Sequence, residues 1–144
     1  MKNVFIAIAT ITAMSCMAQT PPPAAVQAAF TKNFPGINVK KWDKEKNNFE
    51  AEFTKDGRKM TAIFDAKGTW KETETDIAVM ELPAVVTDYI RKNYNGAAAK
   101  EAALIKTPEG EMYEAEVNGK DLLFDKQGKF IKEEQEEDDE EDED

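Results

Sequence analysis

The sequence contains no histidine, and its one cysteine and one serine, Cys16 and Ser15, both lie within the first twenty residues. The chain therefore lacks the usual general base near neutral pH and the commonest zinc ligand. Beyond those twenty residues there is no thiol for a disulfide or a Cys/His metal cluster, and no thiolate or serine nucleophile. These absences predict a protein that is not an enzyme, carries no cofactor and is held together by packing.

A basic stripe is also lacking. The formal charge is −10, but residues 133–144 (EEQEEDDEEDED) hold eleven of the 29 acids, which leaves 18 acids against 19 Lys plus Arg. A nearly neutral body followed by an acidic segment argues against binding to nucleic acid. Like charges at successive positions cannot pack, so residues 133–144 are predicted to be a disordered tail. Such a tail increases solubility, and it can also attract basic partners or loosely hold divalent cations.

The first residues have the pattern of an export signal. A positive start at Lys2 precedes an apolar run of eleven residues, Val4 to Met14, and then small residues up to Ala18. The run is too short to span a membrane and has the length of a signal-peptide hydrophobic region. We expect a signal peptide over residues 1–18 and a location in the periplasm or cell envelope, without a transmembrane segment. Two competing interpretations are a lipoprotein signal with a lipid anchor at Cys16, and a buried N-terminal helix.

The chain repeats itself. Three blocks recur in the same order, two at a shift of sixty residues and one at a shift of sixty-four. The block pairs are Pro23-Ala24-x-Val26 through Gly36 with Pro83-Ala84-x-Val86 through Gly96, Phe49–Phe53 (FEAEF) with Tyr113–Val117 (YEAEV), and Phe64–Trp70 with Phe124–Phe130. Chance does not plausibly produce three ordered blocks, so the sequence indicates a duplicated unit. We expect one repeat over residues 19–76 and a second over residues 77–132.

Each repeat reads as one helix followed by four antiparallel strands. Apolar residues recur at helical spacing after Pro23 and Pro83, and residues 49–53 alternate apolar and acidic as in a strand with one buried face. The expected strands are 37–43, 48–54, 59–65, 69–75, 99–106, 112–118, 120–125 and 129–134. A unit this small buries little alone, so the two sheets are expected to join. The predicted fold is α+β, with one antiparallel eight-stranded sheet and both helices on one face.

The motifs resemble those of a known family. A helix ending in Phe34-Pro35-Gly36, then Trp42, the FEAEF stretch and the Phe-Asp-x-x-Gly-x-Trp motif at 64–70 are similar to the PepSY-like repeat, also called the beta-lactamase-inhibitor-like domain. The resemblance covers roughly residues 21 to 134. It implies an exported bacterial protein of tandem repeats, with a saddle-shaped sheet able to hold a protein partner such as an exported hydrolase. The second repeat departs from the motif because it lacks tryptophan at both aromatic positions.

Five residues are candidates for a partner-binding surface: Trp42, Glu50, Glu52, Glu114 and Glu116. The glutamates occupy equivalent strands of the two repeats and should project from the open sheet face. The plainer interpretation is that they are solvated strand positions, and two sharper ones are acid/base chemistry and a site for a cation or small ligand. Tryptophan dominates many interfaces but also seals small cores. The matched Trp70 is expected in the core, whereas Trp42 has no counterpart in the second repeat.

The segments that begin at Asp65 and Asp125 superficially resemble calcium loops. A calcium loop needs further oxygen ligands at alternate positions, yet Lys67 and Lys126 stand within these segments. We therefore expect hairpin turns here and no metal site. The function predicted from the sequence is a non-enzymatic exported binding module that recognises a protein partner, and the alternative is a periplasmic protein that binds a small ligand or divalent cation.

Overall fold

The computed structural model describes residues 21–135, and the predicted signal peptide lies outside them. One helix precedes four strands in each half of the chain. The first half comprises α1 (Ala24–Asn33), β1 (Lys41–Glu45), β2 (Asn48–Lys55), β3 (Arg58–Asp65) and β4 (Trp70–Ile77). The second half comprises α2 (Ala84–Asn93), β5 (Glu101–Thr107), β6 (Gly110–Val117), β7 (Lys120–Asp125) and β8 (Phe130–Gln135), and a 3-10 turn, η1 (Val79–Glu81), joins the halves.

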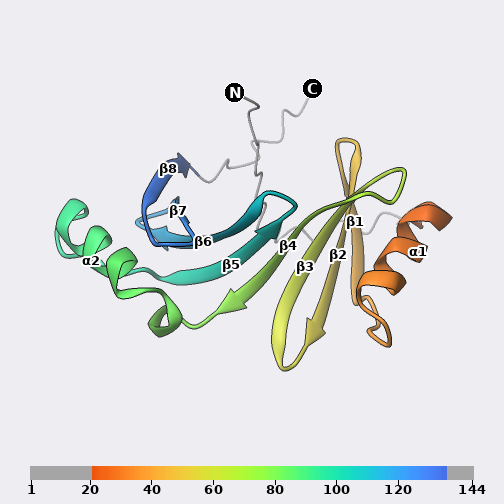
Figure 1. Cartoon of the computed structure of the whole chain (residues 1–144), viewed down its shortest axis with the longest axis horizontal. Helices are drawn as coiled ribbons and strands as arrows, with labels where there is room; N and C mark the ends of the chain where they lie inside the picture. The colour runs from red at the N-terminus through yellow and green to blue at the C-terminus, as the bar shows by residue number, and fades with distance from the viewer. Residues whose placement is uncertain (1–20, 136–144) are drawn as a thin grey trace, which may run out of the picture.

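All eight strands form one antiparallel sheet in the order β1 to β8, so every strand pairs with its neighbours in sequence. The two repeats meet where β4 pairs with β5, from Thr73 opposite Lys106 to Ile77 opposite Ala102. The sheet is bent, and the two helices lie on its outer side, α1 against the first half and α2 against the second (Figure 1). The predicted α+β fold with one eight-stranded sheet is confirmed.

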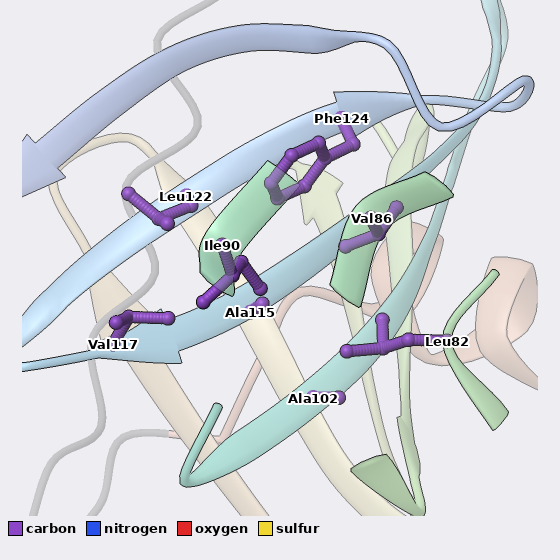
Figure 2. Close-up of a cluster of buried hydrophobic side chains, with 8 residues drawn as sticks. All are labelled: Leu82, Val86, Ile90, Ala102, Ala115, Val117, Leu122 and Phe124. Carbon is purple, nitrogen blue, oxygen red and sulfur yellow. The ribbon is translucent and has the colours of Figure 1, made fainter. Parts of the chain in front are cut away.

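Each helix packs an apolar stripe onto its own half of the sheet. In the first half, Val26 and Phe30 of α1 pack with Phe53 and Phe64, and all four are buried. In the second half, the cluster consists of Leu82, Val86, Ile90, Ala102, Ala115, Val117, Leu122 and Phe124 (Figure 2). Full burial of a large apolar side chain stabilises a fold by roughly 1.5–3 kcal/mol. These two clusters therefore supply most of the packing that a body without disulfides requires.

The strand register places both helices on the same face. Met60 packs with the α1 cluster, and Tyr113 packs with the α2 cluster. Met60 lies opposite Thr75, which lies opposite Leu104, which in turn lies opposite Tyr113. Because directly opposed residues point to the same side of a sheet, the two clusters share one face. No described element covers the other face, which we call the open face.

Strand boundaries differ most from expectation at the start of the first repeat. Strands were predicted at 37–43 and 99–106, but β1 covers Lys41–Glu45 and β5 begins at Glu101. Ile37 and Val39 alternate as in a strand, yet they pack against the α1 cluster from the connecting segment. The first ladder bond runs from Lys40 N to Glu52 O, so no partner strand lies beside the residues before it. The alternation of apolar residues at Ile37 and Val39 therefore led to a strand prediction that is wrong for these residues.

The turns follow the sequence closely. Asp56 and Gly57 both have positive φ, 53° and 75°, as do Asn118 and Gly119, 55° and 73°. Two successive positive φ values define the type I′ turn that suits a two-residue hairpin. At the far end of the sheet, β8 continues to Gln135, so the first residues of the predicted tail are paired with β7. The rest of that segment lies outside the described residues.

Candidate functional site

The open face is strongly acidic. Its strands alternate so that side chains at every second position project to this side, opposite the helices. By register, the acids of this face are Asp43, Glu45, Glu50, Glu52, Asp65, Glu72, Glu74, Asp76, Glu101, Glu114, Glu116, Asp121, Asp125 and Glu134. The lysines of the same face are Lys41, Lys59 and Lys132. Carboxylates therefore outnumber ammonium groups here, although the body as a whole is nearly neutral.

The four predicted glutamates all lie on this face. Glu50 and Glu52 project from β2, and Glu114 and Glu116 project from the equivalent strand β6. Glu114 is buried, with 7% of its surface exposed, whereas the other three are partly exposed. Glu116 forms an ion pair with Lys100, with 3.2 Å between Oε1 and Nζ. Sequence alternation thus located this face correctly, and the burial of Glu114 adds a property that alternation does not show.

Trp42 does not share that face. Its partner in the ladder is Ala51, which is buried in the α1 cluster. The Trp42 ring lies edge-on to Phe30 of α1, with 5.8 Å between the ring centroids. The structure therefore places the four glutamates on one face of the sheet, as two pairs on β2 and β6, and places Trp42 on the other face, against the helix. Trp70 packs against the same cluster, as predicted for a core residue.

Two further carboxylates come from β4. Glu72 and Glu74 lie on the open face at the middle of the sheet, and Glu72 is buried, with 7% of its surface exposed. The Trp70–Ile77 sequence (WKETETDI) alternates acid and threonine, and this was the signal that sequence reasoning missed. Alternation of polar with polar residues does not reveal which side is the inner one, because neither set is apolar.

The central carboxyl groups repel one another. Burial, together with nearby acids, raises the pKa of Glu50 and of Glu72 to about 7. The same causes raise the pKa of Glu74 to about 8 and of Glu114 to about 9. Desolvation is the largest cause in each case, since a buried carboxylate loses hydration that water would give its charge. All four groups therefore hold their protons far more tightly than an exposed glutamate.

The electrostatic interactions cross several strands. Glu114 of β6 interacts with Glu74 of β4 and Asp121 of β7, and Glu72 of β4 interacts with Glu134 of β8. Strands β4 and β8 are four positions apart, and flat sheets keep adjacent strands roughly 4.8 Å apart. Interaction over this span agrees with the bend of the sheet in Figure 1, which makes the open face concave. We call Glu50, Glu72, Glu74, Glu114, Asp121 and Glu134 the concave carboxylate cluster.

Two carboxylate oxygens of this cluster have no hydrogen-bond partner. They are Glu72 Oε1 and Glu114 Oε2, and both are buried from solvent, with no donor among the described residues. A buried polar atom without a partner costs roughly 1–3 kcal/mol, and more when the group is charged. Apolar side chains lie beside them on the same face, namely Ile105 and Leu123 with Met112. The site therefore combines unsatisfied carboxylates with an apolar floor.

The acids of residues 21–135 do not form a metal centre. Across residues 21–135, no three acidic side chains are gathered in a way that could hold a metal ion. The segments at Asp65 and Asp125 are hairpin turns, as predicted. Asp65 Oδ1 accepts bonds from the backbone N–H groups of Lys67 and Thr69, each at 2.9 Å, and Asp125 Oδ1 does the same in the second repeat.

Similar folds are found in crystal structures of other bacterial proteins. A BLIP-like protein from Bacteroides fragilis is 27% identical, with a TM-score of 0.69, and the match covers 81% of this chain and 88% of that one. A protein from Bacteroides eggerthii described as "putative periplasmic" is 20% identical, with a TM-score of 0.72 and coverages of 80% and 89%. A DUF2874 family protein from Bacteroides ovatus is 22% identical, with a TM-score of 0.72 and coverages of 80% and 88%. None of the curated protein sequences matches the chain.

One family model matches most of the sequence. It is described as "Putative beta-lactamase-inhibitor-like, PepSY-like", and it matches twice, over residues 16–62 and 47–132. The double match agrees with the two repeats of the fold, each with one helix and four strands. The chain therefore belongs to the PepSY-like, beta-lactamase-inhibitor-like family.

Proposed function

We propose that this protein is an exported, non-enzymatic binding module and that its open sheet face recognises a protein partner, with an exported hydrolase as the favoured partner class. The observation that carries this proposal is the concave, acidic face that no described element covers. Sheets with both helices on one side normally use the other side for solvent or for a partner. A face that retains buried, unpaired carboxyls is poorly suited to solvent alone.

The chemistry of the sequence and the family membership agree with this role. The chain has no histidine, and none of the threonines on the open face has a histidine beside it to activate its hydroxyl. The family carries a beta-lactamase-inhibitor-like description, and the relative from Bacteroides fragilis is called BLIP-like. Export is supported by the apolar N-terminal run and by the periplasmic description of the relative from Bacteroides eggerthii. Within residues 21–135 no helix has the length and apolar character needed to cross a membrane.

Site-specific photo-crosslinking tests which face binds. A photoreactive amino acid replaces Glu52, which is partly exposed on the open face, or Lys106, which is exposed on the helix-bearing face. We expect the Glu52 variant to crosslink a discrete envelope protein in the producing cell, while the Lys106 variant does not. Identical products from both positions, or a product from Lys106 alone, would exclude the open face as the binding surface.

A further inference from the structure

One of the positions at which the open faces of the two repeats differ carries a lysine in the second repeat and an acid in the first. In the second repeat, Glu114 of β6, Leu123 of β7 and Lys132 of β8 are opposed in one row across the sheet. The corresponding row of the first repeat is Glu50 of β2, Ile63 of β3 and Glu72 of β4. The apolar and acidic positions are retained, but a lysine in the second repeat is replaced by a glutamate in the first.

The lysine of the second repeat is used. Lys132 forms an ion pair with Glu134, two residues along β8 on the same face. The corresponding residues of β4 are Glu72 and Glu74, which are two acids on the same face without a cation between them. No ion pair to either acid is formed within residues 21–135, and Glu72 Oε1 has no hydrogen-bond partner there. The second repeat therefore forms a complete ion pair, Lys132 with Glu134, whereas the first repeat has acids at both of the corresponding positions and no cation.

We propose that the acidic pair Glu72 and Glu74 binds a lysine or arginine side chain of the protein partner, which takes the role that Lys132 has in the second repeat. This inference rests on the proposed function and specifies the chemistry of the segment that docks on the open face. A basic side chain fits because its charged head can meet the carboxylates of this pair, whose surroundings are made apolar by the fully buried side chains of Ile105 and Leu123.

An organic cation fits this site better than a metal ion does. A metal needs three or more oxygens directed at one point, and the described acids do not form such a group. A guanidinium or ammonium group instead donates several hydrogen bonds outward and can pair with carboxylates that lie two positions apart on one strand, such as those of Glu72 and Glu74. Binding would also offset the repulsion among the acids, so the partner gains affinity from a cost already present in the free protein.

The test uses defined peptides and NMR titration of the full chain. The probe is a peptide that alternates leucine with arginine, and its matched control replaces arginine by citrulline, which has the same shape and no charge. We expect the arginine peptide to shift the backbone amide signals of Ile63, Glu74 and Ile105, and to bind at least about tenfold more tightly than the citrulline peptide. Calcium at the same ionic strength should leave those signals unchanged.

Two charge reversals make the result specific to the site. Glu72→Lys makes the first repeat match the second, and it should weaken binding of the arginine peptide at least about tenfold. Glu109→Lys, at an exposed position outside the face, changes the net charge equally and should weaken binding less than about threefold. Far-ultraviolet circular dichroism confirms that each variant is folded.

Three outcomes would overturn the inference: equal binding of the citrulline peptide, wild-type binding by Glu72→Lys, or calcium shifts at the same amides. If any of these occurs while crosslinking from Glu52 still captures an envelope protein, the inference of a basic partner side chain is wrong and the proposed function stands. If the crosslink is also absent, both fail.

Discussion

The sharpest energetic prediction concerns Glu114, the most strongly perturbed carboxyl group of the open face. Its pKa rises from 4.5 to about 9, chiefly through burial and then through repulsion by neighbouring acids. In the unfolded chain the same group ionises near its ordinary pKa. Between these two values the unfolded state holds fewer protons than the folded state, so stability falls as the pH rises. Replacement of this group by glutamine, which never ionises, should remove that loss.

The magnitude follows from the pKa difference. At pH 8 the group is about 3.5 pH units above its ordinary pKa, and each unit corresponds to about 1.4 kcal/mol. The upper bound for the stability lost there is therefore about 5 kcal/mol. In Glu114→Gln the side-chain amide stays buried, and its atom at the position of Oε2 still has no hydrogen-bond partner. That unpaired polar atom costs roughly 1–3 kcal/mol of stability. We expect a net gain of at most about 2–4 kcal/mol at pH 8 and, at pH 5, where the avoided loss is below about 1 kcal/mol, a change between about zero and a loss of about 2 kcal/mol.

The assay is urea denaturation of the wild type and variants at both pH values. The charged groups that face Glu114 from the surrounding strands are Glu72, Glu74, Asp76, Glu101, Glu116, Asp121, Lys132 and Glu134. The matched control is Glu116→Gln, on the same strand and face, which removes the partner of Lys100 and should be neutral or destabilising. A stability difference for Glu114→Gln that is the same at pH 5 and pH 8 would refute the reasoning.

Two other predictions test the packing behind the open face. Gly68→Ala should destabilise the fold by at least about 2 kcal/mol in urea denaturation, since a Cβ there would lie 2.5 Å from the carbonyl oxygen of Ala25 and φ is +83°. Gly36→Ala, with φ +77° and open space around it, should cost only about 1 kcal/mol, and equal losses would contradict the close-approach argument. Trp42→Ala removes the edge contact with Phe30 and should lower stability by about 2–4 kcal/mol while the arginine peptide binds unchanged. Loss of peptide binding by this variant, with the fold intact, would place the site on the wrong face.

Much of the fold could be predicted from the sequence because the two repeats could be compared with each other, position by position. Phe64 and Phe124 recur sixty residues apart, and both are fully buried on the helix-bearing face. The Asn118-Gly119 pair specified its turn through backbone conformation alone. The order of the strands was not readable, because alternation tells which side of a strand is buried and not which strand lies beside it. In this sheet the order turned out to be the simplest one, with every strand next to its neighbours in sequence.

The candidate site was predictable only in part. Glu50 and Glu114 stood out because each is flanked by apolar residues that fix the buried side. Glu72 and Glu74 did not, since threonines flank them and leave the inner side undefined. The burial of Glu72 and its electrostatic interaction with Glu134 of β8 depend on the three-dimensional course of the sheet, which alternation along one strand does not reveal. Trp42 was drawn into the candidate surface because tryptophan is common at interfaces, but its ladder partner Ala51 places it with the core.

The two outermost strands show why the sheet ends at eight. A free strand edge is a template that a further strand, from this chain or another, can extend. In β1 (Lys41–Glu45, KWDKE) only one of the five residues is uncharged, and Lys132, Glu133 and Glu134 stand in succession near the end of β8. An incoming strand would have to align against side chains of alternating sign that already form pairs, such as Lys41 with Asp43 at 2.7 Å. The charged side chains of the two edge strands therefore oppose edge-to-edge pairing between copies of the protein, which would otherwise extend the sheet into a fibre.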